Sequence, residues 1–146
     1  MTTVAYDHKN KTISVDGRIT VNDTIVCDDY DKTIDDGNRI FFFCGKVSDY
    51  GRLISADNGA IELDVDACAL CVFGGEVYRC SVNQDGRFEQ VRLTHSSAIG
   101  RGDEVALTAM DYGATSKEAV IHASKRTTST GGKIRTYDIA NGRWID

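Results

Sequence analysis

The strongest constraint on the fold is the order in which strand and helix patterns follow one another. Up to residue 93 the sequence is dominated by β-rich runs, among them TTVAYD, KTISVDGRIT and NRIFFFCG. Two helical patterns follow, GDEVALTAMDYG and TSKEAVIHASKR, and GGKIRTYDI then returns to a strand pattern. Sheets accompanied by helices that cover them are typical of an α+β sandwich, in which the sheets stack and the helices lie outside.

Local signals predict where several elements begin and end. NRIFFFCG is a continuous apolar run, typical of a strand buried on both faces. The runs CALCVFG, EVYRCSV and RFEQVRL predict three strands in meander order, joined at GG and at NQDG. SDYGRLISA predicts a short helix with Ser48 as its N-cap.

The two late helices carry clearer signals. Val105, Ala109 and Met110 share one helical face, and Gly113 suits the position after a helix end. Thr115 followed by Glu118 has the spacing of a capping box. Because the chain has no proline and no break in composition, we expect a single domain over residues 1–146.

Charge and hydropathy argue against two classes of partner. The net charge is -5 and the acidic residues are scattered, whereas a nucleic-acid-binding domain usually has a basic face. No apolar run is long enough to span a bilayer, and no basic-then-apolar segment follows Met1. We therefore expect a cytoplasmic protein that binds neither nucleic acid nor membrane.

The five cysteines are expected to be reduced and buried as small hydrophobic residues. CALC is a CxxC motif, which in other contexts indicates metal or redox chemistry. Here it lies in a strand-like run, and residues three apart on a strand point to opposite faces. The sequence therefore predicts neither a metal site nor a cofactor at this motif.

Several short motifs, in this order and spacing, resemble the proteasome β-subunit and HslV-type peptidase family. The motifs are TTV, SVDGRIT and DKTI near the start, and AIGRGDEVALTAMDYG and AVIHASKRTTSTGGKIRTYDI near the end. The resemblance covers nearly the whole chain. It implies an N-terminal nucleophile hydrolase fold, a four-layer αββα sandwich of two antiparallel sheets.

The resemblance also implies a set of catalytic residues. A threonine at the N-terminus carries its own base, the free α-amino group, whose pKa a neighbouring ammonium lowers. The matching residues are Thr2 as nucleophile, Lys32 as the ammonium and Asp16 as its carboxylate partner. Gly45 matches the glycine whose N–H faces the oxyanion, and Thr130 keeps a hydroxyl in the SGG-like turn.

Substrate-binding positions follow from the same resemblance. Thr20 matches the position whose backbone pairs with an extended peptide. Ile19, Phe43 and Val47 match residues that line the primary specificity pocket. Each of these positions also has a purely structural interpretation, as an ordinary core residue or strand end.

The sequence departs from the family pattern at four places, the last of which is the first hairpin. Arg101 replaces a serine, and Thr127 replaces an acidic residue that would orient the network around the α-amine. The stretch Lys46–Ala67 replaces a pair of long helices that docks the neighbouring ring or unfoldase. One helical layer is therefore expected to be reduced, and the usual docking partner is not expected to bind in the usual way.

The first hairpin is also short. With Thr2 as nucleophile it has two residues fewer than the family pattern, and an even deletion keeps side chains on their proper faces. A one-residue deletion would instead place Met1 at the nucleophile position. The sequence thus predicts a threonine peptidase in a self-assembled ring once Met1 is removed. An inactive structural or interaction module, or an amidase acting on a small molecule, are the alternatives.

Overall fold

The computed structural model describes residues 2–146, which form antiparallel sheets with a few helices. The chain separates into two units. Unit 1 runs up to Lys32 and resumes at Thr94, and unit 2 is Thr33–Leu93. This mixed architecture of antiparallel sheets and helices agrees with the α+β class expected from the sequence.

Unit 1 is built on a sheet with the strand order β10-β1-β2-β11-β12. Its strands are β1 (Thr3–Asp7), β2 (Thr12–Val15), β10 (Ser97–Gly100), β11 (Arg135–Asp138) and β12 (Arg143–Trp144). The pairs β1–β2, β1–β10, β2–β11 and β11–β12 are all antiparallel. The hairpin of β1 and β2 was expected, whereas the short strands β10 and β12 were not.

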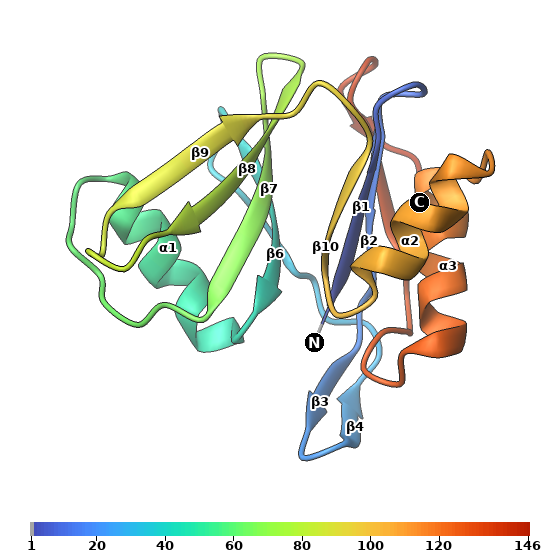
Figure 1. The fold of residues 1–146 in the computed structure, drawn as a ribbon, viewed down its shortest axis with the longest axis horizontal. Helices are drawn as coiled ribbons and strands as arrows, with labels where there is room; N and C mark the ends of the chain where they lie inside the picture. Colours follow the sequence, from blue (N-terminus) through green and yellow to red (C-terminus); the bar gives the residue numbers. More distant parts are fainter. Residues whose placement is uncertain (1) are drawn as a thin grey trace. The chain divides into compact units, whose positions relative to one another are not determined.

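Helices α2 (Asp103–Asp111) and α3 (Ser116–Arg126) cover one face of this sheet (Figure 1). Small side chains let the helices approach: Ala5 of β1 packs with Ala106, Ala119 and Ala123. The capping box at the start of α3 is confirmed, and the predicted face of α2 with Val105, Ala109 and Met110 packs, partly buried, against this cluster. Because strand side chains alternate, Thr3 lies on the helix-covered face with Ala5, and Thr2 lies on the opposite side.

A second hairpin in unit 1 stands as a separate two-stranded sheet of β3 (Ile19–Val21) and β4 (Thr24–Cys27). Its turn residues Asn22 and Asp23 have φ values of 49° and 65°. Positive φ at both central positions is the requirement of a type I′ turn, and asparagine and aspartate tolerate it well. The run KTISVDGRIT thus contains two strands, β2 and the start of β3, and Asp16–Arg18 separates them.

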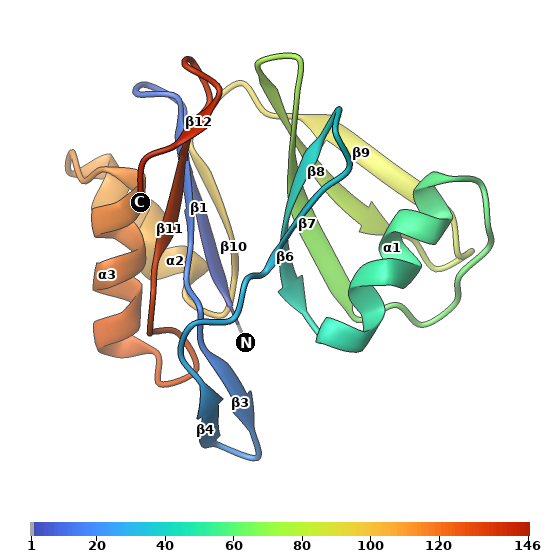
Figure 2. The ribbon, with the colours of Figure 1, turned by 180° about the vertical axis from the view of Figure 1, so that it is seen from behind.

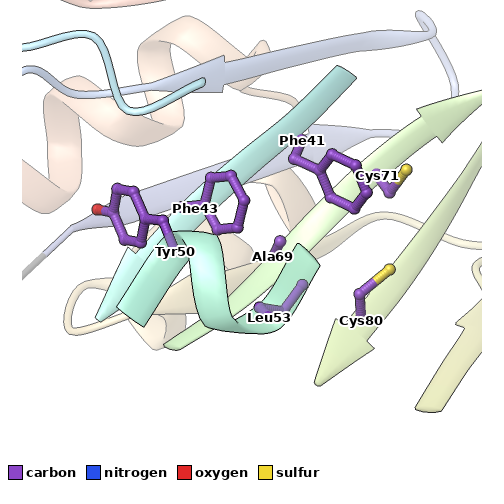
Figure 3. Packing of buried hydrophobic residues seen from close by; sticks show 7 residues of the cluster. All are labelled: Phe41, Phe43, Tyr50, Leu53, Ala69, Cys71 and Cys80. Atoms are coloured by element: carbon purple, nitrogen blue, oxygen red, sulfur yellow. The ribbon is translucent and has the colours of Figure 1, made fainter. Parts of the chain in front are cut away.

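Unit 2 is a sheet in the sequential order β5-β6-β7-β8-β9, which confirms the predicted meander. Its strands are β5 (Thr33–Asp35), β6 (Ile40–Gly45), β7 (Ala67–Phe73), β8 (Glu76–Val82) and β9 (Phe88–Arg92). The helix α1 (Tyr50–Asp57) packs on one face (Figure 2). Phe43 stacks between Phe41 and Tyr50 in the core under this helix (Figure 3).

The segment between β6 and β7 contains a 3₁₀ turn (Val47–Asp49), α1 and an irregular stretch up to Asp66. The predicted short helix is confirmed, but the prediction of Ser48 as its N-cap is wrong. Asp49 holds that position, and its carboxylate accepts a bond from Asp66 N at 2.8 Å. Arg52 adds an ion pair with Glu62, so side chains of the helix region fasten the irregular stretch.

The cysteines differ in their exposure. Cys44, Cys71 and Cys80 are buried as expected, but Cys27 and Cys68 are partly exposed, so the expectation of burial is wrong for these two. Cys68 and Cys71 do lie on opposite faces of β7, because Cys71 belongs to the core under α1 and Cys68 contacts Cys44. No helix within residues 2–146 is both long and apolar enough to cross a membrane.

Candidate active site

Asp16 follows directly after β2 and is the centre of a buried polar cluster in unit 1. Its Oδ1 accepts hydrogen bonds from Thr3 N at 3.1 Å and from Lys32 Nζ at 3.0 Å. Its Oδ2 accepts from Arg18 N at 3.3 Å and from Gly131 N at 2.9 Å. A buried carboxylate with four donors is well satisfied, and through them Asp16 links the start of β1 and the turn at Gly131 to Lys32.

Lys32 comes from the loop between β4 and β5 and is an unusual residue for a protein interior. Both Lys32 and Asp16 have fully inaccessible side chains. Burying an ammonium costs several kcal/mol unless it is paired, so the burial of Lys32 carries a desolvation penalty in the free energy of folding. The structure brings together the two predicted residues Asp16 and Lys32, and it excludes the interpretation of Lys32 as a surface lysine.

Every polar atom of Thr3 has a hydrogen-bond partner, although the sequence analysis assigned this residue no role. Its N–H donates to Asp16, and its C=O accepts from Asp16 N at 3.4 Å. Its hydroxyl accepts from Gly102 N at 3.2 Å and lies 2.8 Å from the Thr130 hydroxyl. The predicted residue Thr130 thus reaches the cluster through Thr3. The sequence signal was only that Thr3 adjoins Thr2.

Thr2 precedes this fixed residue and is itself 2% exposed. Its C=O accepts a hydrogen bond from Arg101 N at 2.8 Å. Gly100 has a φ of 97°, and a Cβ there would overlap the Thr2 carbonyl. Glycine is therefore required for β10 to approach the start of β1 so closely. Met1 lies outside the described residues, so its removal stays a prediction.

A turn from Thr128 to Lys133 closes one side of the cluster, and Arg18 holds it. The guanidinium of Arg18 donates to Asp28 at 2.8 Å and to Thr128 O at 3.0 Å. The hydrogen bond with Arg18 lowers the pKa of the Asp28 carboxyl, and the same bond raises the pKa of Arg18. Gly131 has no room for a Cβ beside this guanidinium. Sequence reasoning missed Arg18, whose signal is its place two residues after Asp16.

The two replaced positions lie at the edge of the cluster. Arg101 is exposed and contributes only its backbone N–H to Thr2. Thr127 caps the C-terminus of α3, and its N–H donates to Ala123 O at 2.9 Å. Arg101 therefore provides no hydroxyl, and Thr127 provides no carboxylate.

The predicted residues of unit 2 have clear local environments. Gly45 ends β6 with a φ of 101°, and a Cβ there would collide with the backbone at Asp66. Phe43 has no exposed surface and belongs to the core under α1, and Val47 packs against the same core. These are the core positions that the sequence left open as an alternative, and a role of either residue in a specificity pocket stays a prediction.

Ile19 and Thr20 lie in β3 and are partly exposed. Among the described residues, β3 pairs with β4 alone, so one edge of β3 has no strand beside it. An unpaired edge presents N–H and C=O groups with which an extended peptide can pair. In residues 2–146 no three His, Cys, Asp or Glu side chains gather as a metal site would require.

Comparison with known proteins gives a match at the level of fold. No family model and no curated protein matches the sequence. Among solved structures, eukaryotic HslV from Trypanosoma brucei matches over 92% of this chain and 97% of that chain, with a TM-score of 0.69 and 14% identity. The chain is thus similar in fold to this proteasome-type protein. The likeness supports the fold family that the motifs indicated.

Proposed function

We propose that this protein is a proteasome-like threonine peptidase whose nucleophile is Thr2. The proposal rests on two hydrogen bonds to one oxygen, Oδ1 of Asp16. This oxygen accepts from Lys32 Nζ at 3.0 Å and from the N–H of Thr3 at 3.1 Å. One buried oxygen thus holds an ammonium beside the residue that follows Thr2. A charge buried at such cost, next to a hydroxyl residue, is typical of a catalytic site.

The proposed chemistry needs the α-amine of Thr2 to be free, which requires the removal of Met1. The amine then takes the proton of the Thr2 hydroxyl, and Oγ1 attacks the peptide carbonyl to form an acyl-enzyme that water hydrolyses. The ammonium of Lys32 lowers the pKa of the amine and favours its neutral form. Gly45 N–H is proposed to bind the oxyanion, and this requires the predicted stacking of the two sheets.

Thr3 is a poorer candidate for the nucleophile. Its hydroxyl is shared between Gly102 N and Thr130, and its N–H is committed to Asp16. A nucleophile whose base is its own α-amine cannot use a nitrogen fixed inside a strand. These bonds support a positioning role for Thr3 and favour Thr2 as the reacting residue.

The proposed substrate is an extended peptide that pairs with the unpaired edge of β3 through the backbone of Thr20, with Ile19, Phe43 and Val47 at the specificity pocket. We also propose that the protein assembles as a homo-oligomeric ring in the cytoplasm. The fold likeness to HslV supports an oligomer. The single short helix between β6 and β7 supports the proposal that a docking partner of the usual kind is not used.

An inactive member of the same fold is the second candidate, and one observation favours it. Thr127 provides no carboxylate near the cluster, and the hydroxyl of Thr130 is bonded to Thr3. The network expected around a catalytic α-amine is therefore thinner than the resemblance implies. In this case the Asp16–Lys32 pair would be a structural element, and the protein would act through binding.

Two measurements separate the candidates. The mass of the N-terminal peptide from the native host reports whether Met1 is removed, and full retention supports the inactive module. Hydrolysis of fluorogenic peptides is then compared among the wild type, Thr2→Ala and Thr2→Ser. Thr94→Ala is a matched control, because Thr94 is an exposed threonine that takes no part in the proposed site. Activity should vanish only in Thr2→Ala, and equal rates for wild type and Thr2→Ala would exclude the peptidase.

A further inference from the structure

The CxxC motif in β7 divides into two separate pairs of thiols. Cys68 has Cys44 of β6 as its directly opposite neighbour, and the two sulfurs are 2.9 Å apart. Cys71, on the other face, interacts with Cys80 of β8. Each cysteine of the motif therefore has its partner on an adjacent strand, and the two cysteines of the motif are not partners of each other.

The geometry of the Cys44–Cys68 pair is compatible with a covalent bond. Residues directly opposite on antiparallel strands have Cα atoms roughly 4.5–5.5 Å apart, within the range of roughly 4.4–6.8 Å that disulfides span. With the two sulfurs already in contact, closing the bond requires only a small approach of the side chains. Because the paired strands already hold the two residues together, forming the disulfide requires little further ordering of the chain.

The two thiols differ in their access to solvent, which sets their order of reaction. Cys44 is 3% exposed, whereas Cys68 is partly exposed. The hydrogen bond with Cys68 raises the pKa of the Cys44 thiol, and burial raises it further, so Cys44 stays protonated. Cys68 is therefore the more accessible residue of the pair, and Cys44 lies beside it in the position of a resolving thiol.

We propose that Cys44 and Cys68 form a reversible disulfide when a hydroperoxide oxidises the protein. The thiolate of Cys68 attacks the terminal OH oxygen of ROOH and the O–O bond breaks, so that Cys68 becomes a sulfenic acid. The remaining RO⁻ takes up a proton from water and leaves as ROH. The Cys44 sulfur then attacks the Cys68 sulfur, and the sulfenic oxygen leaves as water with the Cys44 proton. The two thiols lose two electrons, which reduce the peroxide.

The Cys71–Cys80 pair is an internal control for the reactivity of the Cys44–Cys68 pair. Both residues belong to the core under α1, where Cys71 is 2% exposed and Cys80 is fully buried (Figure 3). The hydrogen bond from Cys80 lowers the pKa of Cys71, with a further lowering by the Arg39 charge. This pair has a thiol of lowered pKa but the poorer access, so comparing the two pairs tests whether access decides reactivity.

Trypsin separates the cysteines so that the cross-link can be read directly. Cleavage after lysine and arginine gives the peptides 40–46 with Cys44, 53–79 with Cys68 and Cys71, and 80–87 with Cys80. The full-length reduced protein is treated with hydrogen peroxide, free thiols are alkylated, and the digest is analysed by mass spectrometry. We expect peptide 40–46 to appear linked to 53–79, at the summed mass less two hydrogen atoms.

Variants identify the bond and keep the proposal falsifiable. The link should persist in Cys71→Ser, disappear in Cys68→Ser, and be reversed in the wild type by dithiothreitol. Because the readout in the wild type needs no substitution, a variant that fails to fold does not obscure the result. A wild-type protein in which Cys44 stays fully alkylatable, or in which 53–79 becomes linked first to 80–87, would overturn the proposal.

Discussion

The Oδ1 oxygen of Asp16 lies 3.0 Å from Nζ of Lys32, and neither side chain has any accessible surface. The carboxylate also accepts hydrogen bonds from the N–H groups of Thr3, Arg18 and Gly131. Asp16 keeps three backbone donors when the ammonium is removed, whereas replacing the carboxylate of Asp16 by an amide takes from Lys32 its carboxylate partner at 3.0 Å and turns an amide nitrogen toward backbone N–H groups.

Asp16→Asn should consequently cost much more stability than Lys32→Met. Removing one partner of a buried ion pair typically costs about 3–5 kcal/mol, because the other charge is left uncompensated. For Lys32→Met the three backbone donors limit the loss. The free energies of unfolding in urea at pH 7 test this order. Equal losses for the two variants would show that the backbone donors do not support the carboxylate.

The hydroxyl of Thr3 gives a second prediction. Thr3→Val has nearly the same shape but leaves Gly102 N–H and the Thr130 hydroxyl without this partner inside the protein. A buried polar group without its partner costs about 1–3 kcal/mol. Thr3→Ser keeps the hydroxyl and should recover most of that stability. Urea unfolding of both variants is the measurement, and a stable Thr3→Val would contradict the assigned bonds.

Local signals in the sequence predicted the fold well where neighbouring residues decide it. The capping box of Thr115 and Glu118 is formed as expected, because both partners lie in one helical turn. The N-cap at Ser48 was wrong because Asp49 is bonded to Asp66, which is distant in the sequence. The short strand β10 was missed since its four residues have little pattern of their own and are held by pairing with β1.

The same contrast between local signals and long-range contacts applies to the candidate site. The resemblance of the motifs to the peptidase family pointed to Asp16 and Lys32, and the structure pairs them. Thr3 and Arg18 were missed because their roles depend on bonds to Gly102, Thr130 and Thr128, far along the chain. No local pattern indicates a contact that only the folded chain creates, so sequence reasoning could name the charged centre of the cluster but not the residues that hold it.

Glycine substitutions test how closely β10 approaches the start of β1. Gly100→Ala adds a Cβ that overlaps the Thr2 carbonyl, at a residue with a φ of 97°. Gly113→Ala is the matched control, because its φ is 96° but nothing lies within 4 Å of the added Cβ. The control should cost about 1–2 kcal/mol for the left-handed backbone alone.

Gly100→Ala should cost clearly more than Gly113→Ala in urea unfolding, because the backbone must also move away from Thr2. If the proposed peptidase is correct, this variant should also lose hydrolysis of fluorogenic peptides while the control keeps it. Similar unfolding energies for the two variants would contradict the close approach at Thr2.

The capping box of α3 predicts a dependence of stability on pH. Hydrogen bonding by the Thr115 N–H, and next by its side chain, lowers the pKa of Glu118 below its ordinary value of 4.5. Since the folded pKa is the lower one, the ionised carboxylate stabilises the fold above pH 4.5. That contribution is lost as the pH falls through the folded pKa, where Glu118 becomes protonated in both states.

Glu118→Gln should therefore melt at a lower temperature than the wild type at pH 7, and the difference should shrink as the pH approaches 3. Thr115→Ser keeps the hydroxyl and the N–H that bind Glu118, so it should retain the pH dependence of the wild type. Thermal unfolding followed by circular dichroism across this range measures both. A difference between wild type and Glu118→Gln that grows toward acid pH would reverse the sign and exclude the ionised carboxylate as the stabilising group.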